Sequence, residues 1–384
     1  MKDKWMLNIV LLVATIFLLT FNSTFASAST STTAKHADSI QEITQTEMQI
    51  QSAIYRGKIM DIKETTPGNQ DMTIRILRGP FKGEIINTQF NITGNPAKDF
   101  YYKKGERVLL WIESQDGEIV RSYVREVTRD NYLAYLALFF IFSLVLIGGK
   151  KGIKTVISLG ITGVLIVYVL IPLILEGYSP VVSTVVVASI IVTSSVFIIS
   201  GFNRKTYSAI LGTIGGVVLA AILAWIMTKA TRLTGLSGDE SQMLMYIPQQ
   251  VNFDFQGLLF AGMIIGAIGA VLDVGVSIAS AIDEVKQNNP SITTKNLIKS
   301  GMNMGKDIMG TMANTLILAY TGASMSLLLV LVAYDIPFVR IVNMDAMSTE
   351  IIRVLAGSIG LIYAIPITAI IAGFMYNYKK ETDV

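Results

Sequence analysis

Long apolar runs fill the last two thirds of the chain, whereas shorter alternating runs precede them. Beyond Asn131, seven apolar segments are each long enough, or nearly so, to cross a bilayer core of roughly 30 Å as a helix. Their approximate bounds are residues 132–149, 153–175, 180–200, 207–229, 257–281, 308–334 and 351–376. This pattern predicts an α-helical polytopic membrane domain with seven spans over residues 131–384.

Residues 51–130 show a different pattern, in which short runs of β-favouring residues are separated by turn residues such as Pro67-Gly68-Asn69. The predicted strands are residues 53–59, 72–77, 84–90, 107–113 and 119–127. Five strands in this length favour a small all-β barrel of the OB or SH3-like type. Its 13 Lys and Arg nearly balance its 11 Asp and Glu, so the charge pattern indicates no nucleic-acid face.

The N-terminal region has features of a segment that directs export. An apolar run over residues 5–21 follows Lys2 and Lys4 and precedes Ala26-Ser27-Ala28, which has the form of a cleavage site. Residues 1–28 are therefore interpreted as a signal peptide or an N-terminal membrane anchor, two alternatives that the sequence leaves open. Residues 29–50 are rich in Ser, Thr, Ala and Gln and are interpreted as a polar linker.

The charges of the loops predict the orientation of the spans. If the β-domain lies outside, the loops and the tail assigned to the cytoplasm contain eleven Lys and Arg, whereas the opposite loops contain four. Positive charge collects on the cytoplasmic side of membrane proteins. We therefore expect a multi-pass protein of the plasma membrane with an extracytoplasmic β-domain and a cytoplasmic C-terminus.

Composition narrows the classes of function. Hydrophobic residues make up 52% of the chain and charged residues only 15%, against roughly 25% charged in soluble chains. The chain has no cysteine and a single histidine, His36, and it lacks Walker A and H-E-x-x-H motifs. We therefore expect no enzyme, no metal site, no cofactor and no nucleic-acid partner.

The fifth apolar segment carries one polar stripe. Gly262, Gly266, Gly269, Asp273 and Ser277 recur at steps of three and four residues, as on one face of a helix. Small residues let a neighbouring helix approach closely. A carboxylate at mid-membrane costs on the order of 2.5–3.5 kcal/mol, so it normally faces a partner or a water-filled cavity. Asp273 is predicted to act in translocation; the alternative is a structural hydrogen bond.

Further polar and small residues accompany that stripe. In the sixth segment, Asn314 and Thr321 are predicted to contribute neutral polar groups to the site from a neighbouring helix. Residues 291–304 resemble a short amphipathic helix on the inner leaflet, capped by Ser291 or Thr293, and a solvated loop is the alternative. Three charged residues are assigned to the cytoplasmic interface, namely Glu284, Lys306 and Asp307. The positions predicted to serve helix packing are Gly262, Gly266, Gly269, Gly212, Gly215 and Gly310.

Two long motifs resemble one family of membrane proteins. The first is Gly266-x-x-Gly269-x-x-x-Asp273-Val274-x-x-Ser277-Ile278-x-Ser280, and the second is Gly301-x-x-x-Gly305-Lys306-Asp307-Ile308-Met309-Gly310-Thr311-Met312-x-Asn314. Together they resemble the YibE/F family of bacterial multi-spanning membrane proteins. The resemblance implies a permease or exporter without an established substrate.

Two classes of function follow for the whole chain. The first is a permease or exporter of a small solute or ion, coupled to ions through the intramembrane carboxylate of Asp273. The second is a membrane-anchored scaffold or envelope-assembly factor whose β-domain binds an envelope protein. An anchor needs neither Asp273 nor Asn314 within the membrane, so these two residues favour the first class.

Overall fold

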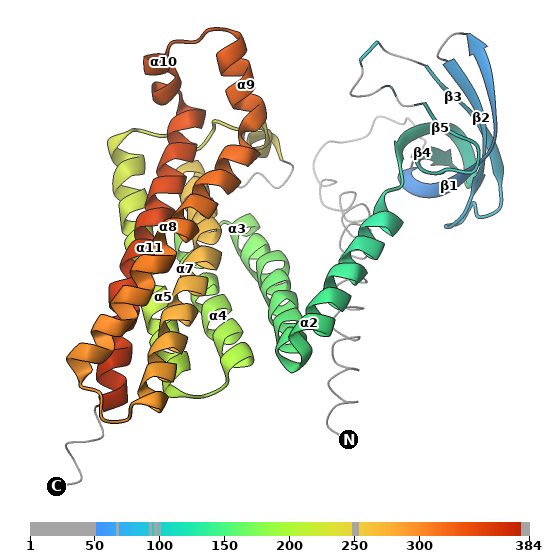
Figure 1. Ribbon diagram of the computed structural model, residues 1–384. Helices are drawn as coiled ribbons and strands as arrows, with labels where there is room; N and C mark the ends of the chain where they lie inside the picture. The colour runs from blue at the N-terminus through green and yellow to red at the C-terminus, as the bar shows by residue number, and fades with distance from the viewer. Residues whose placement is uncertain are drawn as a thin grey trace, which may run out of the picture. The chain divides into compact units, whose positions relative to one another are not determined.

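The computed structural model describes residues 51–66, 69–91, 94–95, 99, 101–247 and 253–377. It separates into two compact units, one that ends at Ser143 and contains the β-domain, and a helical one that begins at Leu144. The predicted signal peptide or anchor (1–28) and the linker (29–50) lie outside the described residues. Figure 1 shows the elements of both units.

Five antiparallel strands form one curled sheet, which confirms the predicted small β-domain. Their bounds are β1 Gln51–Thr66, β2 Asn69–Ile76, β3 Ile85–Phe90, β4 Arg107–Gln115 and β5 Glu118–Val127. The order in the sheet is β3-β2-β1-β4-β5. The first half of β1 pairs with β4 and its second half with β2, which makes β1 longer than predicted. A long first strand shared in this way suits a partly open barrel of the OB type.

Strict alternation along β2 and β4 builds the core of this domain. Every second residue of each strand points inward, so that Met72, Ile74, Leu110 and Ile112 are 0–1% exposed. Gly57 lies in β1 where the pairing passes from β4 to β2. A Cβ atom there would lie 2.5 Å from Ile74 Cγ2 and 2.7 Å from Leu110 Cδ1. The absence of a side chain therefore lets the bent strand cross the core.

The two edge strands of the sheet, β3 and β5, approach each other without a backbone ladder. Each is two antiparallel steps from β1, so both run in the same direction. The hydroxyl of Thr88 in β3 donates a hydrogen bond of 2.9 Å to the carbonyl oxygen of Ser122 in β5. The domain is consequently a half-barrel whose seam is bridged by a side chain.

Truncation of Leu110 to Ala is expected to destabilise the β-domain by about 2–5 kcal/mol, because the side chain is fully buried and a cavity would remain. Urea unfolding of a fragment spanning residues 29–129 measures this loss. The control is Val120→Ala on β5, where the side chain is 50% exposed and the loss should stay below about 0.5 kcal/mol. Equal losses in the two variants would contradict the assigned core.

The helical unit is a bundle of long apolar helices. The helices and their bounds are α2 Asp130–Leu165, α3 Ile171–Leu175, α4 Pro180–Ser200, α5 Arg204–Ala230, α6 Asp239–Met243, α7 Phe255–Asn288, α8 Thr294–Ala323, α9 Met325–Ala333, α10 Phe338–Asn343 and α11 Asp345–Asn377, with one π turn, η1 Ile166–Leu170, and one 3-10 turn, η2 Leu244–Tyr246. Helix α2 starts in the β-domain unit and continues into the helical one.

The helical stretch from Asp130 to Leu175 is interrupted at Gly149. This residue has φ 52° and ψ −127°, outside helical geometry, in a region that glycine adopts easily. The chain turns so sharply there that a Cβ on Gly152 would collide with the carbonyl of Leu144. The interruption falls at the last residue of the predicted segment 132–149, just before the predicted segment 153–175.

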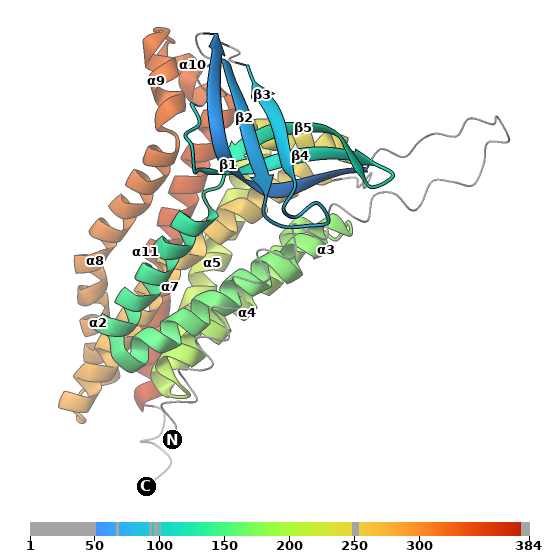
Figure 2. The same ribbon diagram turned by 90° about the vertical axis from the view of Figure 1, so that its right-hand side faces the viewer.

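Small residues hold α5, α7 and α11 together. Helix α11 packs along α5 more extensively than any other pair, and the three helices run side by side in both views (Figures 1 and 2). Gly212 and Gly215 of α5 face Thr368 and Ile367 of α11. Such residues let helix backbones approach closely where no hydrophobic effect drives association.

The predicted helix over residues 291–304 is the first half of a longer one. Helix α8 begins after Thr293, whose hydroxyl accepts a 3.4 Å hydrogen bond from the backbone N–H of Asn296. It continues without a break to Ala323, and a bend of 64° separates it from α9. The predicted span 308–334 therefore combines the second half of α8 with α9.

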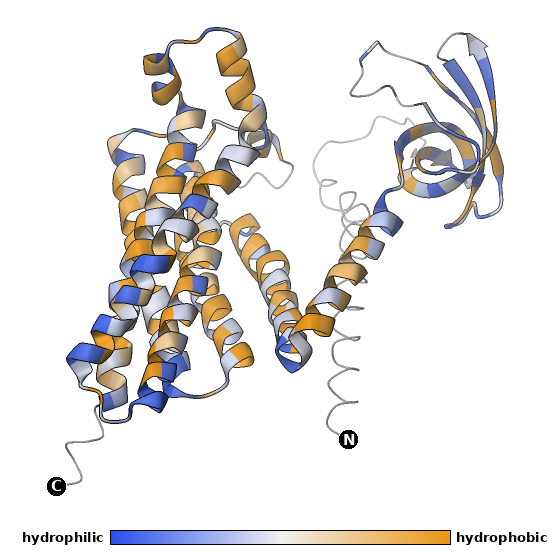
Figure 3. Ribbon diagram, viewed as in Figure 1, coloured by the Kyte–Doolittle hydropathy of each residue, from blue (hydrophilic) through white to orange (hydrophobic). Residues whose placement is uncertain are grey.

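Among the described residues, five helical stretches are long and apolar enough to cross a membrane, or six if α8 and α9 form one span. In Figure 3 orange, apolar residues dominate these helices, while blue, polar residues recur along the lower half of α8. The α-helical membrane class expected from the sequence agrees with this architecture. The predicted number of seven spans stays a prediction. The count of five or six treats the stretch from Asp130 to Leu175 as one span, although the helix is interrupted at Gly149.

Candidate functional site

Helix α7 has one apolar face and one polar face. Its apolar face is buried against α5 and α11, and Val271, Val274 and Ile278 are 0% exposed. On the opposite face, the predicted stripe of Gly262, Gly266, Gly269, Asp273 and Ser277 is exposed. The stripe thus lies away from α5 and α11, and Asp273 lies near the midpoint of a helix on the order of 50 Å long.

Helices α7 and α8 pack side by side and run in opposite directions. The hydroxyl group of Tyr320 covers Gly266, and the side chain of Ile282 covers Gly301. The two contacts pair Gly266 with Tyr320 and Ile282 with Gly301. Linear interpolation between these pairs places Asp273 at the level of about residue 312 of α8. Asn314 is two residues further on, so it lies only about 3 Å from the level of Asp273 along the helix axis. The expectation that the two residues lie at similar depth is consistent with this register.

Similar depth does not bring the two side chains together. The bundle-facing positions of α8 include Gly301, Gly305 and Leu316, and at 100° per residue Asn314 lies on the other side of the helix. Asn314 and Thr321 are both exposed. In the described part of the chain, Asp273 and Asn314 make no hydrogen bond with each other. We refer to the exposed polar residues of these two helices together as the α7–α8 polar face.

The glycines of this face differ in their surroundings. A Cβ at Gly266 would collide with the Tyr320 hydroxyl, whereas a Cβ at Gly262, Gly269 or Gly310 would meet no atom of the described chain within 4 Å. Gly266 thus lies in close contact with Tyr320 of α8. The packing role of the other three has no partner within the described chain and stays a prediction.

The charged residues assigned to the cytoplasmic interface occupy two levels. Glu284 is exposed near the end of α7, as expected for an interface. Asp307 and the adjacent Lys306 are level with about Ser277 by the same interpolation, roughly one turn from Asp273. A second carboxylate therefore lies about one helical turn from the level of Asp273, and its assignment to the cytoplasmic interface stays a prediction.

A hydrogen-bonded network ties the helix ends near Glu284 together. The hydroxyl of Tyr376 donates to Asp283 Oδ1 at 2.6 Å, and the Lys286 ammonium donates to Asn377 Oδ1 at 2.6 Å. Arg204 Nη1 donates to the carbonyl oxygen of Met375 at 3.0 Å, and a cation at the end of a helix also complements its dipole. These contacts fix α5, α7 and α11 relative to one another at this end.

An ion pair near the other end of the face was not anticipated from the sequence. Arg353 Nη1 lies 2.7 Å from Glu350 Oε1, and both side chains are about a quarter exposed. The guanidinium carbon of Arg353 is 5.8 Å from the centroid of the Tyr320 ring, in cation–π range. The signal available in the sequence was the three-residue spacing of opposite charges at the start of an apolar segment.

The chemistry of the site is that of carboxylates and neutral polar groups. Among the described residues, no three His, Cys, Asp or Glu side chains converge in a way that could hold a metal ion. Asp273 and Asp307 contribute carboxyl groups, and Ser277, Asn314 and Thr321 contribute neutral polar groups, all of them exposed on α7 and α8.

Helices of this length and hydropathy define a polytopic membrane protein, which also carries a five-stranded, half-barrel β-domain. The chain belongs to the YibE/F family: the model of the YibE/F-like protein matches residues 136–378, and that of the YibE/F family N-terminal domain matches residues 26–127. The family resemblance of the two sequence motifs is thereby confirmed. No curated protein and no solved structure matches the chain significantly.

Proposed function

We propose that this protein is a permease or exporter of a small solute or ion, and that its path runs along the α7–α8 polar face. The observation that carries the proposal is the exposed carboxylate of Asp273 halfway along an apolar helix. Lipid cannot solvate such a group, so in a membrane it must face water, a solute or another protein surface.

The neighbouring groups favour the interpretation that Asp273 belongs to a polar path and is not an isolated polar residue. Ser277 and Asp307 continue the polar face toward one end of α7, and Asn314 and Thr321 accompany it on α8. The open space at Gly269 and Gly310 leaves room beside these groups. The described chain supplies one wall of the path, because the face points away from its own bundle.

Asp273 would act as the coupling group. A carboxylate is held neutral where it is desolvated and becomes ionised when water or a cation reaches it. Its protonation state can therefore follow the side of the membrane to which the path is open. A scaffold that only anchors a β-domain requires no such group, which is why we favour transport.

Cysteine labelling tests whether the polar face meets water. The chain has no native cysteine, and Gly269→Cys and Gly310→Cys introduce side chains where nothing lies within 4 Å of the added Cβ. In membranes, a charged methanethiosulfonate reagent is expected to label both variants rapidly, because the thiolate forms only in contact with water.

The matched control is Ile190→Cys, on a side chain of α4 that is 46% exposed on an apolar surface. Lipid around this position should exclude the reagent and keep labelling slow. If Gly269→Cys and Gly310→Cys react as slowly as Ile190→Cys, the face is covered by lipid or protein, and the proposed aqueous path is wrong.

A further inference from the structure

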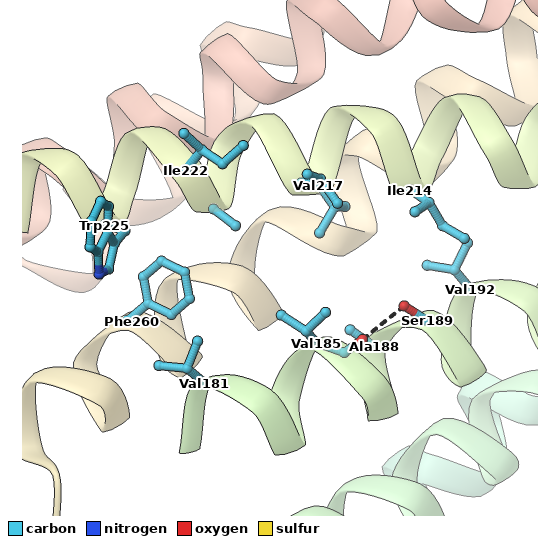
Figure 4. A pocket seen from close by; sticks show the side chains of 12 residues that line it. Val181, Val185, Ala188, Ser189, Val192, Ile214, Val217, Ile222, Trp225 and Phe260 are labelled. Carbon is cyan, nitrogen blue, oxygen red and sulfur yellow. Dashed lines mark hydrogen bonds between the residues drawn. The ribbon is translucent and has the colours of Figure 1, made fainter. Parts of the chain in front are cut away.

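An apolar groove lies between α4, α5 and α7, with a volume of about 280 Å³. In Figure 4, Trp225, Phe260 and Val181 surround one end of it, and Ile214 and Val192 lie at the other. The one hydroxyl group among its lining side chains, that of Ser189, donates to the carbonyl oxygen of Val185 at 2.8 Å. The groove therefore offers an occupant hydrocarbon contacts along its length.

The dimensions of the groove suit a single hydrocarbon chain. Its wall on α5 runs from Ile214 to Trp225, about 16 Å along the helix axis. A water molecule takes up about 30 Å³ in the liquid, and a methylene group is of similar size, so the groove has room for about nine such groups. Ile222 and Trp225 are 49% and 55% exposed, and the groove thus opens sideways to the surroundings of the bundle.

A polar pocket continues the groove at its Trp225 end. This smaller pocket, of about 80 Å³, shares Val181, Trp225 and Phe260 with the groove and adds Thr228, Lys229, Asp254 and Gln256. The Lys229 ammonium donates to Gln256 Oε1 at 2.8 Å. Asp254 caps α7 by accepting a hydrogen bond from the backbone N–H of Gly257 at 2.8 Å. The Lys229 ammonium keeps two further donors for a ligand.

Thr228 supplies an independent sign that this pocket takes a polar ligand. The residue is only 4% exposed, and its hydroxyl has no hydrogen-bond partner within the described part of the chain. Leaving a buried hydroxyl unpaired is unfavourable. Thr228 also lines the pocket, and a rotation of its side chain would bring the hydroxyl to an acceptor oxygen of a ligand there.

We propose that this groove and pocket together bind one glycerophospholipid. One acyl chain fills the groove, an ester carbonyl accepts a hydrogen bond from Thr228, and the phosphate pairs with Lys229. Trp225 lies where apolar and polar parts meet, the position that tryptophan favours at membrane interfaces. The site uses the buried side of α7 at Phe260, away from the stripe of Asp273, so it stands independently of the transport proposal.

Native mass spectrometry of the full chain tests this site. The delipidated protein in detergent is titrated with dioleoyl-phosphatidylglycerol, with dioleoyl-phosphatidylethanolamine and with dodecanol, which has a chain but no phosphate. We expect one phospholipid to be retained per chain, and dodecanol to be retained less. Both phospholipids carry a phosphate, so retention of either one, or of both equally, supports recognition of the phosphate. If phosphatidylethanolamine is retained better than phosphatidylglycerol, its ammonium group is additionally assigned to Asp254.

Two variants separate this site from lipid that merely surrounds the helices. Val185→Phe fills part of the groove and should weaken retention of the phospholipid roughly tenfold. This factor corresponds to about two fewer methylene groups of the acyl chain buried in the groove. Val186→Phe is the matched control, since Val186 is the next residue of α4, is 53% exposed and does not line the groove. It should retain the lipid as the unchanged protein does.

Thr228→Val provides a test that does not alter the groove. It keeps the shape of the side chain and removes only the unpaired hydroxyl, so the fold should persist while phospholipid retention weakens. Equal lipid retention by Val185→Phe and Val186→Phe would overturn the proposed site. Retention of dodecanol as strong as that of phospholipid would overturn the assignment of the polar pocket to a headgroup.

Discussion

Replacement of Asp273 by Asn is expected to abolish ion-coupled transport while leaving the protein folded. Asn preserves the size and hydrogen-bonding capacity of the side chain but can neither release a proton nor carry negative charge. Proteoliposomes containing the purified chain provide the assay, with a pH gradient followed by an internal pH dye and a sodium gradient followed by a sodium indicator. The unchanged protein should dissipate at least one gradient faster than protein-free liposomes, and Asp273→Asn should return that rate to background.

The control for this experiment is Asp239→Asn, which removes an exposed carboxylate from the first turn of the short helix α6. It should transport at the unchanged rate. Thermal unfolding of both variants establishes that any loss is not a loss of folding. If Asp273→Asn transports normally, or if the unchanged protein dissipates neither gradient, the proposed coupling role of the carboxylate is wrong.

Gly216→Leu is expected to destabilise the helical unit strongly. A Cβ at this position would lie 2.7 Å from Ala364 Cβ, 2.8 Å from the Gly360 carbonyl oxygen and 2.8 Å from Val271 Cγ1. These atoms belong to α11 and α7, and one is backbone, so the side chain cannot be accommodated by a rotamer change. Overpacking typically costs 1–3 kcal/mol, and we expect a loss of about 3 kcal/mol or more here.

A loss of this size corresponds to a melting temperature roughly 6–12 °C lower for a unit of this length. Thermal unfolding in detergent micelles measures it. Gly269→Leu is the matched control, because it makes the same exchange within α7 at a position where no described atom lies within 4 Å of the added Cβ. If both variants melt at the same lowered temperature, the close contact of α5 with α11 does not carry the stability assigned to it.

The strands and the long helices of this protein follow from local patterns. Alternation along residues 72–77 and 107–113 identified β2 and β4, because a strand places successive side chains on opposite faces whatever surrounds it. The polar stripe of the fifth apolar segment was equally readable, since 100° per residue fixes which side chains share a helix face. The composition of the apolar segments likewise determined the membrane class.

The direction in which each helix face points was decided by tertiary packing alone. The glycines of the α7 stripe predicted a packing face, yet α7 buries its opposite side, where Val271 and Val274 meet α5 and α11. A helical period identifies two faces but not their partners, because both apolar and small residues can pack in a membrane. For the same reason the sequence placed Asp273 and Asn314 at similar depth without determining that Asn314 would lie on the outer side of α8.

The lipid-binding groove depended on tertiary structure entirely. Thr228 and Lys229 end one helix and Gln256 begins another, and the groove beside them needs residues of α4 as a third wall. No periodicity within a single segment relates these positions, since their proximity results from the way three helices cross. The sequence by itself therefore determined the elements, their faces and the membrane class, whereas the packing of helices distant in the chain decided which faces remain open to a solute or a lipid.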